Sequence, residues 1–265
     1  MTRKNESMKV VILAGGFGTR IRDVADDIPK PMIPIGPYPI LWHIMKYYAS
    51  FGHRDFVLCL GYKGNVIREF FLNYEAYTRD VTLKLGNASA LSFHSNHSES
   101  DWEVTLTDTG LNAMTGARIA RIARYVGDDD FFLTYGDGVG DIDLDALLAF
   151  HRSHGKVLTV TGVRPPGRFG ELRSVDGAVT EFNEKPQAAG GRISGGFFVA
   201  SKRIFEYLQG GDGMVFEQDP MRLLVREGNL MVFEHDGFWQ PMDTSREYHV
   251  LNSLYAQGEA PWVRW

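Results

Sequence analysis

The sequence predicts a three-layer α/β fold in which a mainly parallel sheet is covered by helices on both faces. Apolar runs of strand length alternate along the chain with segments whose apolar residues recur at helical spacing. Several of these runs are apolar without interruption, which is typical of strands buried on both faces. The chain has 265 residues, of which 44% are hydrophobic and 23% are charged, so it can form a large core.

The same patterns place the elements in order. Strands are expected at 9–14, 56–60, 81–85, 103–107, 131–135, 157–163, 178–183, 196–200 and 230–234. Helices are expected at 40–50, 65–74, 117–126, 144–154, 216–226 and 246–257. The β-rich segments near 86–107 and 165–200 predict small antiparallel inserts over the ligand edge of the sheet. No linker or repeat interrupts the pattern, so we expect a tail at 1–7 and a single domain at 8–265.

Composition excludes several classes of function. A net charge of −5 argues against a nucleic-acid partner. The single cysteine, Cys59, lies in an apolar run, which excludes an intrachain disulfide and a cysteine-rich zinc site. No apolar run approaches the roughly 20 residues that span a bilayer, and residues 1–7 do not resemble a signal peptide. We therefore expect a cytoplasmic protein with no membrane partner.

A glycine-rich turn follows the first strand and predicts a phosphate site. The strand ends at Gly15 and Gly16, and Gly18, Thr19 and Arg20 come next. Backbone N–H groups of such a turn can point at an anion, and Arg20 and the nearby Lys30 add positive charge. The turn matches neither common phosphate motif, because Ile21 replaces the third glycine of a dinucleotide site and no Gly-Lys-Ser/Thr follows. A purely structural turn is the alternative.

Two aspartates are candidate Mg²⁺ ligands. Asp137 follows the strand at 131–135 between two glycines, where the carboxyl ends of parallel strands face a ligand crevice. Asp243 precedes the last helix. Mg²⁺ bound at phosphates prefers one or two carboxylates. The alternatives are an Asx turn for Asp137 and a helix N-cap for Asp243.

A second candidate site lies near residues 184–196. Lys185 could hold a smaller phosphate, and Glu184 could accept hydrogen bonds from hydroxyl groups. Gly195 and Gly196, after Ser194, would give a ligand close access to the backbone. A surface ion pair is the alternative for Glu184 and Lys185.

Taken together, these motifs resemble those of the sugar-1-phosphate nucleotidylyltransferases, and most closely the cytidylyltransferase branch of that family. The resemblance spans residues 8–265 in family order. It is carried by AGGFGTR at 14–20, PKPM at 29–32, PILWHIM at 39–45, GYKG at 61–64, DTG at 108–110 with MTG at 114–116, YGDG at 135–138, PPGRFG at 165–170, EKP at 184–186, GGFF at 195–198 and FWQPMDT at 238–244.

The resemblance implies a Rossmann-like nucleotidyltransferase fold and a reaction. CMP passes from CTP to a sugar-1-phosphate, with glucose-1-phosphate as the expected acceptor, and pyrophosphate leaves. Mg²⁺ would be held by Asp137 and Asp243, and Arg20, Lys30 and Asp137 would be catalytic. The branch forms homo-oligomers, so we expect a homo-oligomer, such as a hexamer.

The resemblance also assigns the binding residues. Those implied for the nucleotide are Leu13, Ala14, Gly15, Gly16, Gly18, Thr19, Arg20, Lys30, Thr109, Gly110, Thr115, Arg118 and Gly136. Those implied for the sugar phosphate are Glu184, Lys185, Ser194, Gly195 and Gly196.

Two departures from the branch leave alternatives open. Pro37 and Tyr38 stand where the branch has Gly-Lys, and Ser194 stands where it commonly has Asn. A serine hydroxyl is shorter than the Asn amide and offers fewer hydrogen bonds, so another phosphorylated acceptor is one alternative. Another nucleoside triphosphate and a glycosyltransferase are further alternatives. An inactive binding subunit would be expected to lack Arg20, Lys30 or the carboxylates, and all are present.

Overall fold

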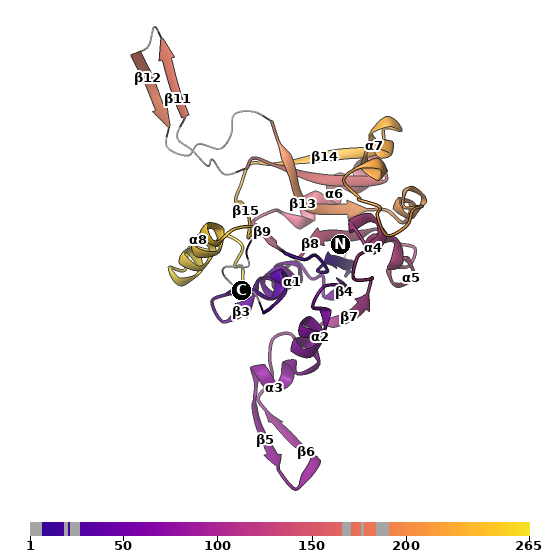
Figure 1. The fold of residues 1–265 in the computed structure, drawn as a ribbon, viewed down its shortest axis with the longest axis vertical. Coiled ribbons are helices and arrows are strands. Elements are labelled where there is room, and N and C mark those ends of the chain that lie inside the picture. Colours follow the sequence, from indigo (N-terminus) through magenta and orange to yellow (C-terminus); the bar gives the residue numbers. More distant parts are fainter. Residues whose placement is uncertain (1–6, 19–20, 22–26, 166–170, 176–177, 184–190) are drawn as a thin grey trace, which may run out of the picture.

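The protein forms a seven-stranded central sheet flanked by helices, as a computed structural model describes it for residues 7–18, 21, 27–165, 171–175, 178–183 and 191–265 (Figure 1). The strands run in the order β14 (Leu230–His235), β10 (Leu158–Val163), β13 (Ile193–Ala200), β8 (Phe131–Tyr135), β1 (Lys9–Leu13), β4 (Asp55–Leu60) and β7 (Glu103–Asp108). Neighbouring strands are parallel, except that β13 is antiparallel to both β10 and β8. The expected mixed, mainly parallel sheet is confirmed.

Helices cover both faces of the sheet, and alternate residues of each strand point to opposite faces. Val10 and Ile12 of β1 enter one core, and Val11 and Leu13 enter the other. The first core includes side chains of α1 (Ile40–Ser50), α2 (Gly64–Leu72), α6 (Leu144–His154) and α8 (Ser245–Ala256). The second includes side chains of α4 (Thr115–Arg121), α5 (Ala123–Val126), the 3₁₀ helix η3 (Lys202–Tyr207) and α7 (Asp219–Arg226). This is the three-layer arrangement that the continuous apolar strands predict.

Small antiparallel pieces complete the fold. They are β2 (Pro34–Ile35) with β3 (Tyr38–Pro39), β5 (Asp80–Lys84) with β6 (Asn87–His94), β9 (Gly138–Gly140) with β15 (Trp239–Pro241), and β11 (Glu171–Val175) with β12 (Ala178–Asn183). The hairpins β5–β6 and β11–β12 project away from the central sheet (Figure 1). The expected antiparallel inserts are confirmed. They do not lie over the edge of the sheet, however, and the segments near 103–107 and 196–200 join the sheet itself as β7 and β13.

Two expected helices are each divided. Residues 65–74 contain nearly all of α2 and the first residue of α3 (Tyr74–Thr78), and residues 117–126 contain most of α4 and all of α5. The backbone leaves helical geometry at Asn73 and Ile122, where ψ is 13° and 2°. None of the helices among the described residues combines the length and the apolar character needed to cross a membrane.

Candidate active site

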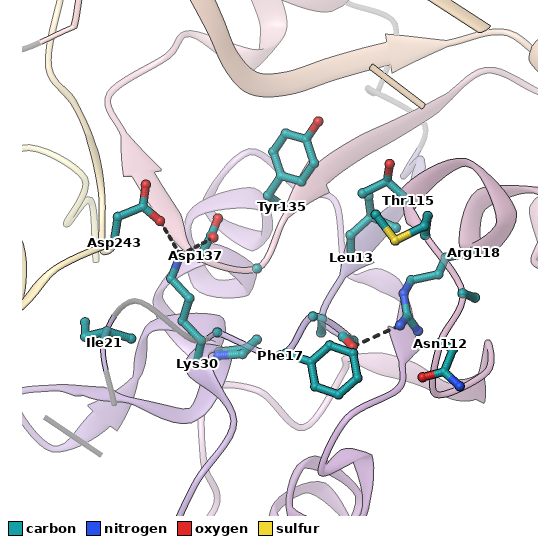
Figure 2. Close-up of a pocket in the computed structure, with 18 residues that line it drawn as sticks. Leu13, Phe17, Ile21, Lys30, Asn112, Thr115, Arg118, Tyr135, Asp137 and Asp243 are labelled. Atoms are coloured by element: carbon teal, nitrogen blue, oxygen red, sulfur yellow. Dashed lines mark hydrogen bonds and ion pairs between the residues drawn. The ribbon is translucent and has the colours of Figure 1, made fainter. Parts of the chain in front are cut away.

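A cavity of about 370 Å³ opens where β1 and β8 end (Figure 2). It is lined by Leu13, Ala14, Gly15, Gly16, Phe17, Gly18, Ile21, Lys30, Pro31, Asn112, Ala113, Met114, Thr115, Arg118, Tyr135, Gly136, Asp137 and Asp243. Because β1 and β8 are parallel, their carboxyl ends lie at the same edge of the sheet. This pairing brings the glycine turn after β1 next to the Gly136–Asp137 turn after β8, and the Gly136 N–H donates a hydrogen bond to the Leu13 carbonyl (3.0 Å).

Lys30 lies between two carboxylates at one end of the cavity. It begins the 3₁₀ helix η2 (Lys30–Met32), and its Nζ donates to Asp137 Oδ2 and Asp243 Oδ1 at 2.5 Å each (Figure 2). Burial alone would lower the pKa of Lys30, but the charges of Asp137 and Asp243 raise the pKa above its ordinary value. Lys30 is therefore a fixed cation at this end of the cavity.

The β9–β15 ribbon brings the two carboxylates together. Asp137 immediately precedes β9, Asp243 follows β15, and Pro241 pairs with Gly138. The Met242 N–H donates to the Asp137 carbonyl at 2.8 Å. The cap of α8 is Thr244, whose hydroxyl accepts the Glu247 N–H in a capping box, so Asp243 is not the N-cap. The Asp243 carboxylate faces Lys30 instead.

The carboxylate pair has the donor set for a divalent cation. Both carboxylates reach one cationic atom, the Lys30 Nζ, which stands where a shared metal ion could bind. Among the described residues, no group of three or more His, Cys, Asp and Glu side chains is placed to hold a metal. A cation here would therefore rest on two protein carboxylates and on oxygens of the ligand, as Mg²⁺ commonly does at phosphates.

Arg118 packs behind the glycine turn and binds its backbone. The guanidinium, which is buried, donates to the carbonyls of Gly15 (3.0 Å), Leu60 (3.0 Å) and Leu111 (3.3 Å) and to the Thr109 hydroxyl (2.9 Å). Burial lowers the pKa of Arg118 from its ordinary value. Because its donors are used by the protein itself, Arg118 shapes the wall of the cavity by joining three loops.

Two residues that the resemblance assigns to the nucleotide are not in the cavity wall. Thr109 is fully buried, and its hydroxyl donates to the Leu60 carbonyl at 2.7 Å. Gly110 adopts a positive φ of 96° and lies against Arg121. The described wall on this side is formed by the chain that follows, from Asn112 to Thr115.

A carboxylate hub connects two wall residues that come from different elements. Glu217 accepts the Thr115 hydroxyl at 2.6 Å and also accepts the Tyr135 hydroxyl. The Thr115 hydroxyl in turn accepts the Phe216 N–H at 2.9 Å. Burial raises the pKa of Tyr135, and the Glu217 charge raises it further, so the phenol stays protonated.

The candidate sugar-phosphate residues Ser194, Gly195 and Gly196 lie on β13, next to the cavity rather than in its wall. Gly196 has a φ of 75°, and an added Cβ would lie 2.4 Å from the Tyr135 ring. Tyr135, which lines the cavity, therefore lies directly against Gly196. Pro37 and Tyr38 do not line the cavity either, and the Tyr38 ring stacks on Trp42 with centroids 4.1 Å apart.

The structure brings most of the predicted nucleotide and metal residues into one wall. These are Leu13, Ala14, Gly15, Gly16, Gly18, Lys30, Thr115, Arg118, Gly136, Asp137 and Asp243. Thr19, Arg20, Glu184 and Lys185 lie outside the described residues. The sequence reasoning did not select Phe17, Ile21, Pro31, Asn112, Ala113, Met114 and Tyr135. Most of these residues lie inside or beside the motifs quoted above. Their position next to a motif was therefore the one sequence feature that could have identified them.

Comparison with known proteins matches nearly the whole chain. A family profile described as "Nucleotidyl transferase" matches residues 9–257. A curated glucose-1-phosphate cytidylyltransferase from Salmonella typhi is 49% identical over 259 residues, which are 97% of this chain and 100% of the relative.

Solved structures share the fold at lower identity. HddC from Yersinia pseudotuberculosis has a TM-score of 0.66 and 23% identity, covering 94% of this chain and 99% of that one. A UTP-bound UGPase from Acinetobacter baumannii has a TM-score of 0.67 and 15% identity, covering 96% of this chain and 94% of that one.

Proposed function

The chain belongs to the nucleotidyl transferase family, and on that basis we propose that it transfers CMP from CTP to glucose-1-phosphate, giving CDP-glucose and pyrophosphate. The near-full-length match with the Salmonella typhi enzyme supports this pair of substrates. We also take residues 8–265 to form one domain, because the central sheet draws its strands from both halves of the chain.

The observation that carries the proposal is the position of Lys30 between Asp137 and Asp243 at one end of a glycine-lined cavity. A cation and two carboxylates suit the triphosphate and its Mg²⁺. The other end, from Asn112 to Thr115, is then left for the nucleoside. Arg20, which the sequence places on the glycine turn, adds a second cation to the triphosphate.

The reaction needs charge stabilisation more than acid–base chemistry. A phosphate oxygen of the sugar phosphate forms a bond to the α-phosphorus of CTP. The bond from that phosphorus to the bridging oxygen breaks, and pyrophosphate leaves with the electron pair. Lys30 and Arg20 stabilise the negative charge that develops on the phosphoryl oxygens. Mg²⁺, held by Asp137 and Asp243, would supply further charge neutralisation when bound.

We place the acceptor at Ser194, Gly195 and Gly196, with Lys185 on its phosphate and Glu184 on its hydroxyls. The support is the proximity of β13 to the Tyr135 wall of the cavity. Since Ser194 replaces a longer Asn, the alternative of a different sugar phosphate rests on this position.

We propose that the protein is a homo-oligomer. The support is a set of exposed apolar side chains on α2, α3 and the β5–β6 hairpin, which are Leu72, Tyr77, Leu83, Leu85 and Leu91. Projecting apolar surface of this kind commonly marks a contact with another protein. Light scattering should give a multiple of the 29.8 kDa chain mass for the wild type and a smaller mass for Leu85→Asp. A monomeric wild type would refute the oligomer.

The substrate pair can be tested with a matrix of nucleoside triphosphates against sugar-1-phosphates, read by pyrophosphate release. CTP with glucose-1-phosphate should exceed each other combination by roughly tenfold or more, as expected for a site that hydrogen-bonds its own substrate. Faster release with another triphosphate would refute the assignment of the nucleotide. Faster release with another sugar phosphate would favour the alternative acceptor.

The role of Lys30 can be tested in the same assay. Lys30→Ala should lower kcat by about 10²–10³-fold, because it removes a preorganised charge from the transition state. Lys9→Ala is a matched control, since Lys9 also pairs with an aspartate, Asp55, but lies at the opposite end of β1. Unchanged turnover in Lys30→Ala would remove Lys30 from the mechanism.

A further inference from the structure

The β9–β15 ribbon carries a tryptophan that reaches from the carboxylate pair to the candidate acceptor strand. Trp239 pairs with Gly140 in the ribbon, four residues before Asp243 in the sequence. Its indole Nε1–H donates a hydrogen bond of 2.7 Å to the Gly195 carbonyl on β13. One side chain therefore connects the ribbon that presents Asp137 and Asp243 to the strand that carries Ser194 and Gly196.

The indole lies along the two glycines of β9. A Cβ added to Gly138 would lie 3.9 Å from the Trp239 Nε1, and one added to Gly140 would lie 3.6 Å from the indole Cδ1. The indole therefore lies over the same side of β9 toward which a Cβ of Gly138 or Gly140 would point. Since Gly138 directly follows Asp137, the indole sits beside one of the two carboxylate residues.

The pairing of β13 with β10 is irregular around Gly195, unlike the pairing along the rest of the strand. The register between β10 and β13 shifts between Val160 and Gly162, whose partners are Phe198 and Ser194. Gly195 and Gly196 lie within this irregular stretch. Two side chains from outside β10 also contact this stretch, with the Trp239 indole on the Gly195 carbonyl and the Tyr135 ring against Gly196.

We propose that Trp239 is a positioning residue that fixes the acceptor segment Ser194–Gly196 relative to the ribbon bearing Asp137 and Asp243. The inference rests on the proposed function and deepens it. An in-line transfer requires the acceptor oxygen to be held at a set distance from the α-phosphorus, and small misplacements are costly. The indole N–H fixes the distance between the acceptor segment and the ribbon, because its hydrogen bond joins the two segments directly and is independent of the strand pairing in the sheet.

The test is Trp239→Phe, which keeps an aromatic ring and removes the N–H donor. The KM for the acceptor should rise about five- to tenfold, as expected when one hydrogen bond of ordinary strength is lost, while the KM for CTP stays within about twofold. The split between the two KM values distinguishes positioning of the acceptor from a general loss of stability, which would affect both substrates alike.

Trp42→Phe is the matched control. The Trp42 indole N–H also makes one hydrogen bond, of 2.8 Å to the Tyr74 hydroxyl, and Trp42 does not line the cavity. Both KM values should stay at the wild-type level in this variant. Should Trp239→Phe fold poorly, benzothienylalanine at position 239 retains the bicyclic shape and replaces the N–H with sulfur, and the same KM split is expected.

The result can be separated from the proposed function. The kinetics use the nucleotide and sugar phosphate that the wild type turns over fastest. A pair other than CTP and glucose-1-phosphate would correct the proposed function, and the KM split would still be measured for that acceptor. Equal acceptor KM values in Trp239→Phe and Trp42→Phe, or an equal rise in both KM values for Trp239→Phe, would overturn the positioning role.

Discussion

Gly15 and Gly16 are neighbours in the glycine turn, but the space around them differs. A Cβ on Gly15 would lie 2.3 Å from the Arg118 Nη1, whereas a Cβ on Gly16 would meet nothing within 4 Å. Gly15 therefore makes room for the buried guanidinium, and Gly16 gives an open approach to the cavity. The sequence marks both as ligand-binding glycines, because the position of Arg118 beneath the turn depends on the tertiary fold.

This difference predicts that the two alanine substitutions affect different properties, namely stability for Gly15 and nucleotide binding for Gly16. Gly15→Ala should destabilise the protein by about 1–3 kcal/mol, the usual cost of overpacking a tight site. Gly16→Ala should leave stability within about 0.5 kcal/mol of the wild type but raise the KM for CTP, because its methyl group would face the ligand. Urea denaturation and steady-state kinetics measure the two effects. Equal stability of the two variants would contradict the distinction.

Lys30 occupies the place that the two carboxylates could offer to a metal ion. With its Nζ 2.5 Å from both, the nucleotide-free protein already neutralises part of their charge. We predict that Lys30→Met raises the affinity of the nucleotide-free protein for Mn²⁺ by about tenfold or more, because two carboxylates then face each other without that cation. Titration followed by the electron paramagnetic resonance of free Mn²⁺ measures this affinity.

The control for this titration is Lys9→Met, which removes a lysine from the Asp55 ion pair far from the cavity. Its affinity for Mn²⁺ should match that of the wild type. If Lys30→Met bound Mn²⁺ no more tightly than the wild type, the carboxylate pair would not be the cation site.

At the scale of elements, the segment before α7 supports the part of the cavity wall that contains Thr115 and Tyr135. Glu217 accepts the hydroxyls of Thr115, at the start of α4, and Tyr135, at the end of β8. The Met214 carbonyl also accepts the N–H groups of Gly116 and Ala117. This segment therefore holds the first turn of α4 in place against the end of β8.

We predict that Glu217→Gln raises the KM for CTP severalfold and costs about 1–2 kcal/mol of stability, since hydrogen bonds to a charged acceptor are stronger than those to an amide. Glu227→Gln is the control, because Glu227 also accepts a tyrosine hydroxyl, that of Tyr207 at 2.6 Å, but Tyr207, unlike Tyr135, does not line the cavity. Kinetics and chemical denaturation of both variants make the comparison. A KM for CTP that stays unchanged in Glu217→Gln would remove the hub from the site.

The sequence predicts elements best where a long periodic or apolar run decides them. The helices at 40–50 and 144–154 and the strands at 131–135 and 178–183 have the predicted bounds. The short strands β2, β3, β9 and β15 were not predicted, since two or three residues carry no periodicity. Yet β9 and β15 form the ribbon that brings Asp137 to Asp243, so a decisive part of the site came from elements too short to detect.

At the scale of the whole molecule, the sequence located Asp137 from the strand pattern, whereas the position of Asp243 needed more than the local sequence. Asp137 could be located because it follows a predicted buried strand, and the carboxyl ends of parallel strands face the ligand crevice. The resemblance placed Asp243 in the same site as Lys30, but it did not predict the contact between them, because this contact depends on how the last part of the chain returns to the sheet. The positions of Thr109 and Arg118, buried under the cavity, likewise depend on packing between loops.

Buried histidines distributed over the fold couple its global stability to pH. His43, His53 and His151 are almost completely buried, and burial lowers the pKa of each to about 4. His43 is satisfied as a neutral ring, with Nδ1 accepting the Trp262 indole N–H at 3.3 Å and Nε2 donating to the Ile35 carbonyl at 2.9 Å. These rings are therefore uncharged in the folded protein at neutral pH, and they regain an ordinary pKa near 6.5 when the chain unfolds.

The stability of the folded state should consequently fall as the pH is lowered from about 6.5 towards 4, because the unfolded chain then binds more protons than the folded one. For each histidine, the free energy of unfolding falls by up to ~1.4 kcal/mol for each pH unit below about 6.5. Above that pH, the histidines make no contribution to the slope. Urea denaturation between pH 7.5 and 5.5 measures the slope. His53→Asn should lower the slope by the share of one histidine, whereas His249→Asn, at an exposed position, should leave it unchanged. A free energy of unfolding that stayed constant across this range would show that these histidines bind protons equally well in both states.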